Sequence, residues 1–243
     1  MPRWSFVILV VAAILSGCQY PFGKSKVPAD LVQQIDTTAA TKPVELSAKE
    51  AAEACKITAV ELAKHGFETD AIAELEHARS LHPRTKSVSR HLAVLYDRAG
   101  KSSEAKREYE VALKEQPKDP DLLNDYGYFF AEQNDWVEAE KQYRKALGLA
   151  PQHQRASVNL GLAVAQQGRY DESRRIFSAV VGESAAWSNV GMVMAQRNDL
   201  EEAKSAFEKA AELEPTLAIP QAALSQLESS QKESVARVHF END

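Results

Sequence analysis

The feature that most constrains this sequence is its similarity to itself at an interval of 34 residues. Prolines, aromatic residues and glycines recur at that spacing: Pro83, Pro117 and Pro151; Tyr109, Tyr143 and Phe177; Gly127 and Gly161. Agreement in this many columns indicates that one supersecondary unit is repeated along the chain. We therefore expect an array of stacked units, each packed against its neighbours, rather than a single central core.

The stretch from Asn124 to Pro151 shows what one unit contains. Positions spaced i, i+3, i+4 and i+7 predict one face of a first helix: Leu123, Tyr126, Gly127 and Phe130. The same spacing predicts a second helix: Ala139, Tyr143 and Ala146. Asn134-Asp135 supplies the turn and the helix N-cap between them. Pro151 ends the second helix, because proline lacks the amide hydrogen and clashes with the preceding turn.

This pattern resembles the tetratricopeptide repeat family, whose units contain L-G-x-x-Y, then A-x-x-x-F-x-x-A, then a closing proline. Five units are identified, at about residues 52–85, 86–119, 120–153, 154–183 and 184–217. The resemblance implies an all-α fold, a right-handed α-solenoid of helix–turn–helix repeats within a domain at 47–232. A C-terminal capping helix is expected at 218–231, where apolar residues alternate with polar ones at helical spacing.

The fourth unit is shorter than the others. Pro151 and Pro215 are 64 residues apart, four fewer than two full repeats, and the missing residues fall after Val180. Because four residues make about one helical turn, the shortened helix can keep its packed face in register. We expect an altered angle between the last two units; the alternative is a neutral change in a loop.

The N-terminus carries the features of a signal peptide at residues 1–17. A short basic start precedes an apolar run of twelve residues, Trp4 to Leu15, which is shorter than the ~20 residues that span a bilayer. Leu15-Ser16-Gly17-Cys18 follows and resembles the bacterial lipobox, L-[AS]-[GA]-C. The resemblance implies that Cys18 is lipidated, for example with palmitate, and becomes the first residue of the mature chain. The alternative is an uncleaved signal anchor with an incidental cysteine.

The segments that flank the repeats complete the predicted organisation. Residues 18–46 are expected to form a flexible lipidated tether, and residues 233–243 a disordered tail. Ser47 and Glu50 form a predicted capping box, so the first ordered helix should begin there. Gln19 after the lipidated cysteine resembles sorting to the outer membrane of a bacterium with two membranes, with the domain facing the periplasm. Cys55 is then the remaining thiol, and we expect it to be buried and structural.

Composition and motifs argue against several classes of function. The chain has a net charge of −6 with acids and bases interspersed, and no basic patch with interleaved aromatics, so nucleic-acid binding is not expected. The six histidines are scattered, and HExxH, paired CxxC, GxSxG and P-loop motifs are absent from the sequence. We therefore expect no catalytic residues, no metal, no cofactor and no small-molecule substrate.

The expected function is protein–protein interaction, because a repeat array offers surfaces rather than a reaction centre. A lipid-anchored chain of this kind resembles the PilF/PilW and TadD types, which help to assemble pili and secretion systems. It also resembles the NlpI type, an adaptor that regulates cell-wall hydrolases or proteases. The repeats alone do not separate these two alternatives, since one fold serves many partners.

The resemblance also implies where a partner would bind. In this family the first helix of each unit lines a concave groove, and its ninth position faces inward: Val60, Val94, Tyr128, Leu162 and Met192. The fifth position adds five residues around this stripe: Lys56, Arg90, Asn124, Val158 and Ser188. Val60 is not the asparagine that a chaperone-type carboxylate clamp needs. We expect an extended or amphipathic peptide with apolar anchors, its acidic end near Lys56 and Arg90. The alternative is that the apolar stripe packs against neighbouring repeats or the tether.

Overall fold

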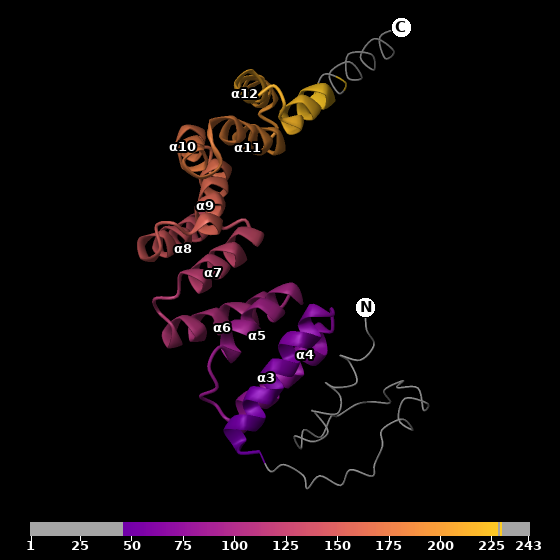
Figure 1. The fold of residues 1–243 in the computed structure, drawn as a ribbon, viewed down its shortest axis with the longest axis vertical. Helices are drawn as coiled ribbons and strands as arrows, with labels where there is room; N and C mark the ends of the chain where they lie inside the picture. Colours follow the sequence, from indigo (N-terminus) through magenta and orange to yellow (C-terminus); the bar gives the residue numbers. More distant parts are fainter. Residues whose placement is uncertain (1–45, 228, 230–243) are drawn as a thin grey trace, which may run out of the picture. The chain divides into compact units, whose positions relative to one another are not determined.

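The computed structural model describes residues 46–227 and residue 229, and every regular element among them is a helix (Figure 1). The labelled helices are α3 (Ala48–Lys64), α4 (Glu68–Leu81), α5 (Val88–Arg98), α6 (Ser102–Glu115), α7 (Pro120–Glu132), α8 (Trp136–Leu149), α9 (Gln154–Gln166), α10 (Tyr170–Val181), α11 (Glu183–Gln196) and α12 (Leu200–Leu213). Residues 218–227 are also helical. The predicted signal peptide, the tail, and the tether up to residue 45 lie outside the described residues, as does Cys18.

The helices pack as consecutive antiparallel pairs, which confirms the predicted all-α repeat fold. The pairs are α3 with α4, α5 with α6, α7 with α8, α9 with α10, and α11 with α12. The chain divides into two compact units, Met1–Glu115 and Gln116–Asp243, here called unit 1 and unit 2. The first two pairs belong to unit 1 and the last three to unit 2.

In unit 1, α3 begins where the sequence predicts. The Ser47 hydroxyl accepts a hydrogen bond from the Glu50 amide at 3.3 Å, and the Glu50 carboxylate accepts one from the Ser47 amide at 2.9 Å. Each group satisfies an amide that the first turn leaves without a helical partner. Cys55 is buried, as predicted, and faces the α3–α4 interface with Ala59 and Leu75.

Each helix pair turns at a residue with positive φ. These residues stand at one position of the repeat: Gly66, Gly100, Asn134, Gly168 and Asn198, with φ between 60° and 81°. Glycine and asparagine adopt this conformation at low cost, so they recur here. After the turn in the third pair, Asp135 caps α8, because its carboxylate accepts a hydrogen bond from the Glu138 amide at 3.2 Å. The predicted Asn134-Asp135 turn and cap are confirmed, and α8 ends two residues before Pro151.

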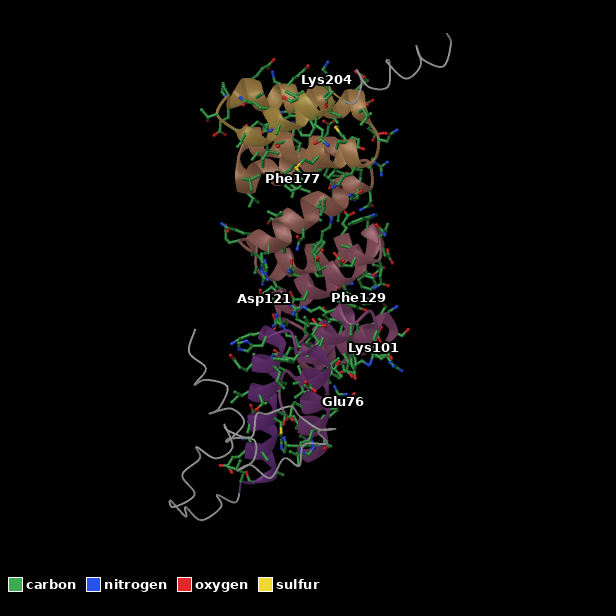
Figure 2. All side chains as sticks on the ribbon, turned by 90° about the vertical axis from the view of Figure 1, so that its right-hand side faces the viewer. Glu76, Lys101, Asp121, Phe129, Phe177 and Lys204 are labelled. Carbon is green, nitrogen blue, oxygen red and sulfur yellow. The ribbon has the colours of Figure 1, made fainter. Side chains whose placement is uncertain are left out.

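A glycine–aromatic contact closes each helix pair of unit 2. A Cβ placed on the glycine would lie 2.5 Å from the Tyr143 ring at Gly127, 2.8 Å from the Phe177 ring at Gly161, and 3.0 Å from the Phe207 ring at Gly191. Such distances are well inside van der Waals contact, so a side chain at these positions would force the helices apart. The repeated glycine and aromatic columns are therefore two halves of one contact (Phe177 is labelled in Figure 2).

The shortened fourth pair has a compact connection to the fifth. Helix α10 has 12 residues, where α8 and α12 have 14. Gly182, with φ 86° and ψ 165°, caps the end of α10 and also precedes the first residue of α11. Glu183 holds this joint, because it pairs with Arg174 and accepts a hydrogen bond from the Ser178 hydroxyl at 2.6 Å. Phe177 of α10 stays buried against α11, and the altered angle between the last two pairs stays a prediction.

The last helix pair is covered by residues 218–227. Ala223, Leu224 and Leu227 pack against a core cluster that includes Phe177, Val190, Met194 and Phe207. An array of stacked helices leaves an apolar edge at its end, and this segment covers part of it. The segment forms part of the predicted capping helix; its residues 228, 230 and 231 lie outside the described residues.

Candidate interaction surface

Three large apolar side chains are exposed on the first helices of unit 2. Tyr128 on α7 is 50% exposed, Leu162 on α9 is 37% exposed and Met192 on α11 is 44% exposed. They occupy the same position of three successive repeats, and α9 contacts both α7 and α11. We call these three residues the first-helix face of unit 2.

The helical repeat explains why this face is exposed. On α7, Gly127 faces Tyr143 of α8, and Gly127 and Phe129 are both buried, whereas Tyr128 between them points in a third direction and is exposed. Three residues beyond each exposed side chain stands an alanine: Ala131, Ala165 and Ala195. These small residues leave the C-terminal side of each exposed side chain without a bulky apolar neighbour at that position of its own helix. Single exposed apolar residues are common on protein surfaces, and what distinguishes these three is that they recur at one position of adjacent helices.

A polar network lies at the start of α7 and α9. Arg155 donates a hydrogen bond to the Asp121 carboxylate at 2.6 Å, and Nε2 of His153 lies 3.2 Å from the same oxygen (Asp121 is labelled in Figure 2). Nδ1 of His153 accepts the Ala156 amide at 3.1 Å, so neutral His153 carries its proton on Nε2 and donates it to Asp121. Burial acts to raise the pKa of Asp121, but the hydrogen bonds from Arg155 and His153 outweigh it and lower that pKa.

The fifth-position residues of unit 2 lie deeper than the first-helix face. Asn124 is only 3% exposed, and its side-chain oxygen accepts a hydrogen bond from Asn159 at 3.0 Å. Val158 is half-buried against the core cluster of the last pair. Ser188 is 3% exposed, and its hydroxyl has no hydrogen-bond partner among the described residues. Asn124 and Val158, both predicted to line the groove, are therefore less accessible than the three exposed side chains.

Two acidic residues that the sequence analysis did not single out lie beside Tyr128. Asp125 and Glu132 stand three residues before it and four residues after it, and helical geometry places such residues on one side of the helix. Burial raises the pKa of the Tyr143 hydroxyl, and Tyr128, Glu132 and Asp125 raise it further. All three side chains therefore lie in the neighbourhood of the Tyr143 hydroxyl group. The sequence could have indicated these acidic neighbours of Tyr128, because α7 contains no basic residue.

In unit 1 the predicted residues form a basic region. Lys56 lies 2.5 Å from Glu53 and donates a hydrogen bond to the Lys86 carbonyl at 3.3 Å. Burial lowers the pKa of His91, and the charges of Arg90 and Lys56 lower it further, so these three side chains are neighbours. The ninth-position residues Val60 and Val94 are half-buried. The structure thus places Lys56 and Arg90 near His91, with Glu53 paired to Lys56. The binding of an acidic segment by Lys56 and Arg90 stays a prediction.

The described residues were also searched for metal-binding groups and for helices that could cross a membrane. They contain no group of three or more histidine, cysteine, aspartate or glutamate side chains placed to hold a metal ion. None of the helices described for residues 46–227 is both long and apolar enough to cross a membrane.

Comparison with known families identifies the repeats. Residues 184–217 match the family model of the tetratricopeptide repeat, and residues 89–185 match that of the middle TPR-like domain of cilia and flagella-associated protein 70. Among curated proteins, the chain is 41% identical over 64 residues to Protein POLLENLESS 3-LIKE 2 of Arabidopsis thaliana. That match covers 25% of this chain and 15% of the relative. It is 29% identical over 112 residues to the BBSome complex member BBS4 of Xenopus tropicalis, covering 44% of this chain and 22% of that protein. The chain thus spans less than a quarter of either relative.

Solved structures resemble the fold over most of the chain. YrrB, described as a TPR protein with an unusual peptide-binding site, has a TM-score of 0.56 and 22% identity, covering 71% of this chain and 91% of YrrB. PilF of Pseudomonas aeruginosa has a TM-score of 0.56 and 19% identity, covering 80% of this chain and 90% of PilF. A MamA structure has a TM-score of 0.54 and 21% identity, covering 68% of this chain and 97% of MamA. At these identities the likeness concerns the fold.

Proposed function

The chain is built of tetratricopeptide repeats, and from this premise we propose that it is a non-enzymatic protein–protein interaction scaffold. Proteins of this fold generally present surfaces that bind segments of other proteins, and such repeats carry no reaction centre of their own. The observation that carries the proposal is the first-helix face of unit 2. Three apolar side chains are exposed there at equivalent positions of adjacent helices, which is the arrangement that a peptide with several apolar anchors requires.

Replacing two residues of this face tests the proposal. Tyr128→Ala with Leu162→Ala should weaken capture of a partner from detergent-solubilised envelope, while helicity and melting temperature stay near wild type. Truncating an interface aromatic typically costs ~2 kcal/mol or more, which is about a 30-fold loss of affinity. Val137→Ala is the control, because Val137 is apolar and exposed but lies on the second helix α8. Normal capture by the double variant would show that the partner binds elsewhere.

We also propose that the scaffold is held at a membrane by lipid on Cys18, on the outer membrane and facing the periplasm. The lipobox-like Leu15 to Cys18 and the apolar run before it support this proposal. Acyl chains contribute ~0.8 kcal/mol per buried methylene, so a multiply acylated cysteine anchors a protein firmly. Cys18→Ser should leave a slower-migrating precursor that takes up no fatty-acid label. A wild-type chain that also takes up no label would refute the anchor.

Within the envelope we propose a role in assembling a complex such as a pilus or a secretion system. The lipobox-like start, the length of the repeat array and the fold shared with PilF support this role. The second candidate is an adaptor that regulates cell-wall hydrolases or proteases. Mass spectrometry of proteins that are captured by wild type and lost with the Tyr128/Leu162 variant separates the two. Pilus or secretion subunits favour the first role, and cell-wall peptidases favour the second.

A further inference from the structure

Two side chains of the first-helix face lie towards the C-terminal end of the array. Leu162 on α9 and Met192 on α11 are exposed, and α11 packs directly on α9. The covering segment, residues 218–227, packs in turn on the core cluster to which α10, α11 and α12 contribute. Helix α9, helix α11 and the covering segment therefore follow one another along unit 2 (Figure 1). The chain that continues after the covering segment thus begins one helix away from α11.

The tail at residues 233–243 has the sequence pattern of a segment that binds by one side. Ala236, Val238 and Phe240 occupy every second position, and Arg237 and His239 stand between them. Successive side chains of an extended chain point to opposite sides. In an extended tail, one side would therefore present three apolar groups in a row, and the other side would carry Arg237 and His239.

We propose that the tail binds back on Leu162 and Met192 as an extended segment and so occupies part of the first-helix face. Val238 and Phe240 pack on these two side chains, while the arginine and the histidine between and before them point to solvent. This inference rests on the proposed function, because it makes the tail an internal competitor for the face that binds a partner segment. A partner must displace the tail before it can cover the whole face.

The chain after the covering segment is long enough for this contact. Val238 stands eleven residues after Leu227, which is up to ~37 Å of extended chain. Packed helices lie about 8–10 Å apart, so α9 lies roughly 20 Å from the covering segment, two packing distances away. The tail also belongs to the same compact unit as the face, whereas the tether before residue 46 belongs to unit 1. The tail is therefore the segment of this chain that is best placed to reach the face.

Tethering makes a weak contact sufficient. A tail that is disordered when free has to be ordered on binding, which lowers its affinity for the face. A short linker offsets this loss, because it gives the tail an effective concentration on the order of millimolar beside the face. A second copy of the chain would have to reach a similar concentration in solution to compete. The internal contact is therefore favoured over the same contact between two chains.

The first test measures binding of the tail as a separate peptide. It uses the full chain in a neutral detergent, a variant that lacks residues 233–243, and a fluorescent peptide of residues 233–243. The truncation removes no residue that the structure describes. Fluorescence anisotropy should give the truncated chain a Kd for the peptide at least about tenfold below that of the full chain, whose own tail competes. Equal Kd values for the two chains would refute the internal competitor.

Substitutions in the peptide test its one-sided geometry. Val238→Ser with Phe240→Ser should abolish binding to the truncated chain, because these side chains make the apolar contacts. Arg237→Ser with His239→Ser is the matched control, since it changes the opposite side and should alter the Kd by less than about twofold. Similar losses from the two double substitutions would contradict an extended tail that binds by one side.

Variants of the truncated chain locate the site. Leu162→Ala with Met192→Ala should raise the Kd of the peptide about tenfold or more. Leu149→Ala with Leu213→Ala is the matched control, because both leucines are exposed but lie on the second helices α8 and α12. It removes apolar groups from another surface and should leave the Kd unchanged. Equal effects would mean that the peptide adheres to any exposed apolar group, and the proposal would fall.

A cross-link in the full chain tests the internal contact directly. A photoreactive benzophenone side chain in place of Phe240 should attach to α9 or α11 of the same chain when a dilute sample is irradiated, as mass spectrometry can show. Cross-links that join two chains would place the tail on a neighbouring copy and refute the internal contact. Cross-links to helices other than α9 and α11, or a lack of cross-links, would refute it as well.

Capture from detergent-solubilised envelope separates this inference from the proposed function. Removal of residues 233–243 should increase capture of the proteins that the Tyr128/Leu162 double variant loses. If the peptide does not bind the truncated chain and the double variant still loses those proteins, the tail inference is wrong and the scaffold proposal stands. If the peptide binds at Leu162 and Met192 but neither change alters capture, the tail contact stands and the proposed binding face is wrong.

Discussion

Gly127 and Tyr143 show how single residues set the distance between helices in this chain. An added Cβ at Gly127 would lie 2.5 Å from the Tyr143 ring, so the glycine fixes how closely α7 and α8 approach. The sequence predicted that Gly127 and Tyr143 lie on the apolar faces of a first and a second helix, because both positions recur in the repeat. It did not predict that Asn124 is buried under Asn159, or that Asp125 and Glu132 flank Tyr128. Those details depend on side chains from neighbouring helices, which the pattern of one helix does not contain.

Gly127→Ala tests the contact at this scale. The new methyl group must push Tyr143 away, and overpacking of this kind destabilises a protein by about 1–3 kcal/mol. Gly148→Ala is the control, because a Cβ at Gly148 meets nothing within 4 Å and alanine favours the helix by up to about 1 kcal/mol. Urea unfolding should therefore show a lower midpoint for Gly127→Ala and an unchanged or higher one for Gly148→Ala. A Gly127→Ala midpoint that matched the control would mean that α7 and α8 separate without cost.

At the scale of helices and turns, the sequence predicted a few helix boundaries. The capping box at Ser47 and the cap at Asp135 stand where predicted, because capping depends on residues three apart in the chain. The shortened α10 followed from the four missing residues. The sequence did not predict that Gly182 alone separates α10 from α11. Its backbone conformation, φ 86° and ψ 165°, is indicated in the sequence only by the presence of a glycine. The repeat pattern offers no second copy of this joint for comparison.

The two kinds of glycine predict opposite responses to asparagine. Gly168 stands at the turn position where Asn134 and Asn198 occur naturally with φ near 60° to 67°, so Gly168→Asn should cost only a few tenths of a kcal/mol. Gly182 has an extended ψ with positive φ, a region that only glycine enters freely, so Gly182→Asn should cost about 1–3 kcal/mol. Thermal unfolding followed by circular dichroism compares them. Equal melting temperatures for the two variants would contradict the distinction between the two conformations.

At the scale of the whole molecule, the sequence predicted five helix pairs and a covering helix at the C-terminal end. It did so because each pair repeats the same contacts and needs information only from nearby residues. The charged residues can be counted from the sequence. Their division between first and second helices requires the helix bounds that the structure gives. The lipidation site and the tether remain predictions, because they lie outside the described residues.

The covering segment at 218–227 should stabilise the end of the array. Leu224→Ala removes a half-buried side chain from the last core cluster, and we expect a loss of roughly 1–2 kcal/mol in the stability of the last pair. Ile219→Ala is the control, because Ile219 is exposed and its truncation should cost less than about 0.5 kcal/mol. Hydrogen exchange measured by mass spectrometry should show faster exchange in α12 for Leu224→Ala alone. Unchanged exchange in both variants would mean that the segment does not protect the last pair.

The recurring glycine–aromatic contact also bears on how the chain reaches its fold. Gly127, Gly161 and Gly191 each accept an aromatic ring, and the three rings that fill them are of similar size. A first helix can therefore receive the second helix of another repeat almost as well as its own during folding. The short turns prevent this, since only Gln133, Asn134 and Asp135 separate α7 from α8. Deleting residues from this turn would stop α8 from folding back onto its own α7, and two chains would then exchange α8 to form a domain-swapped dimer.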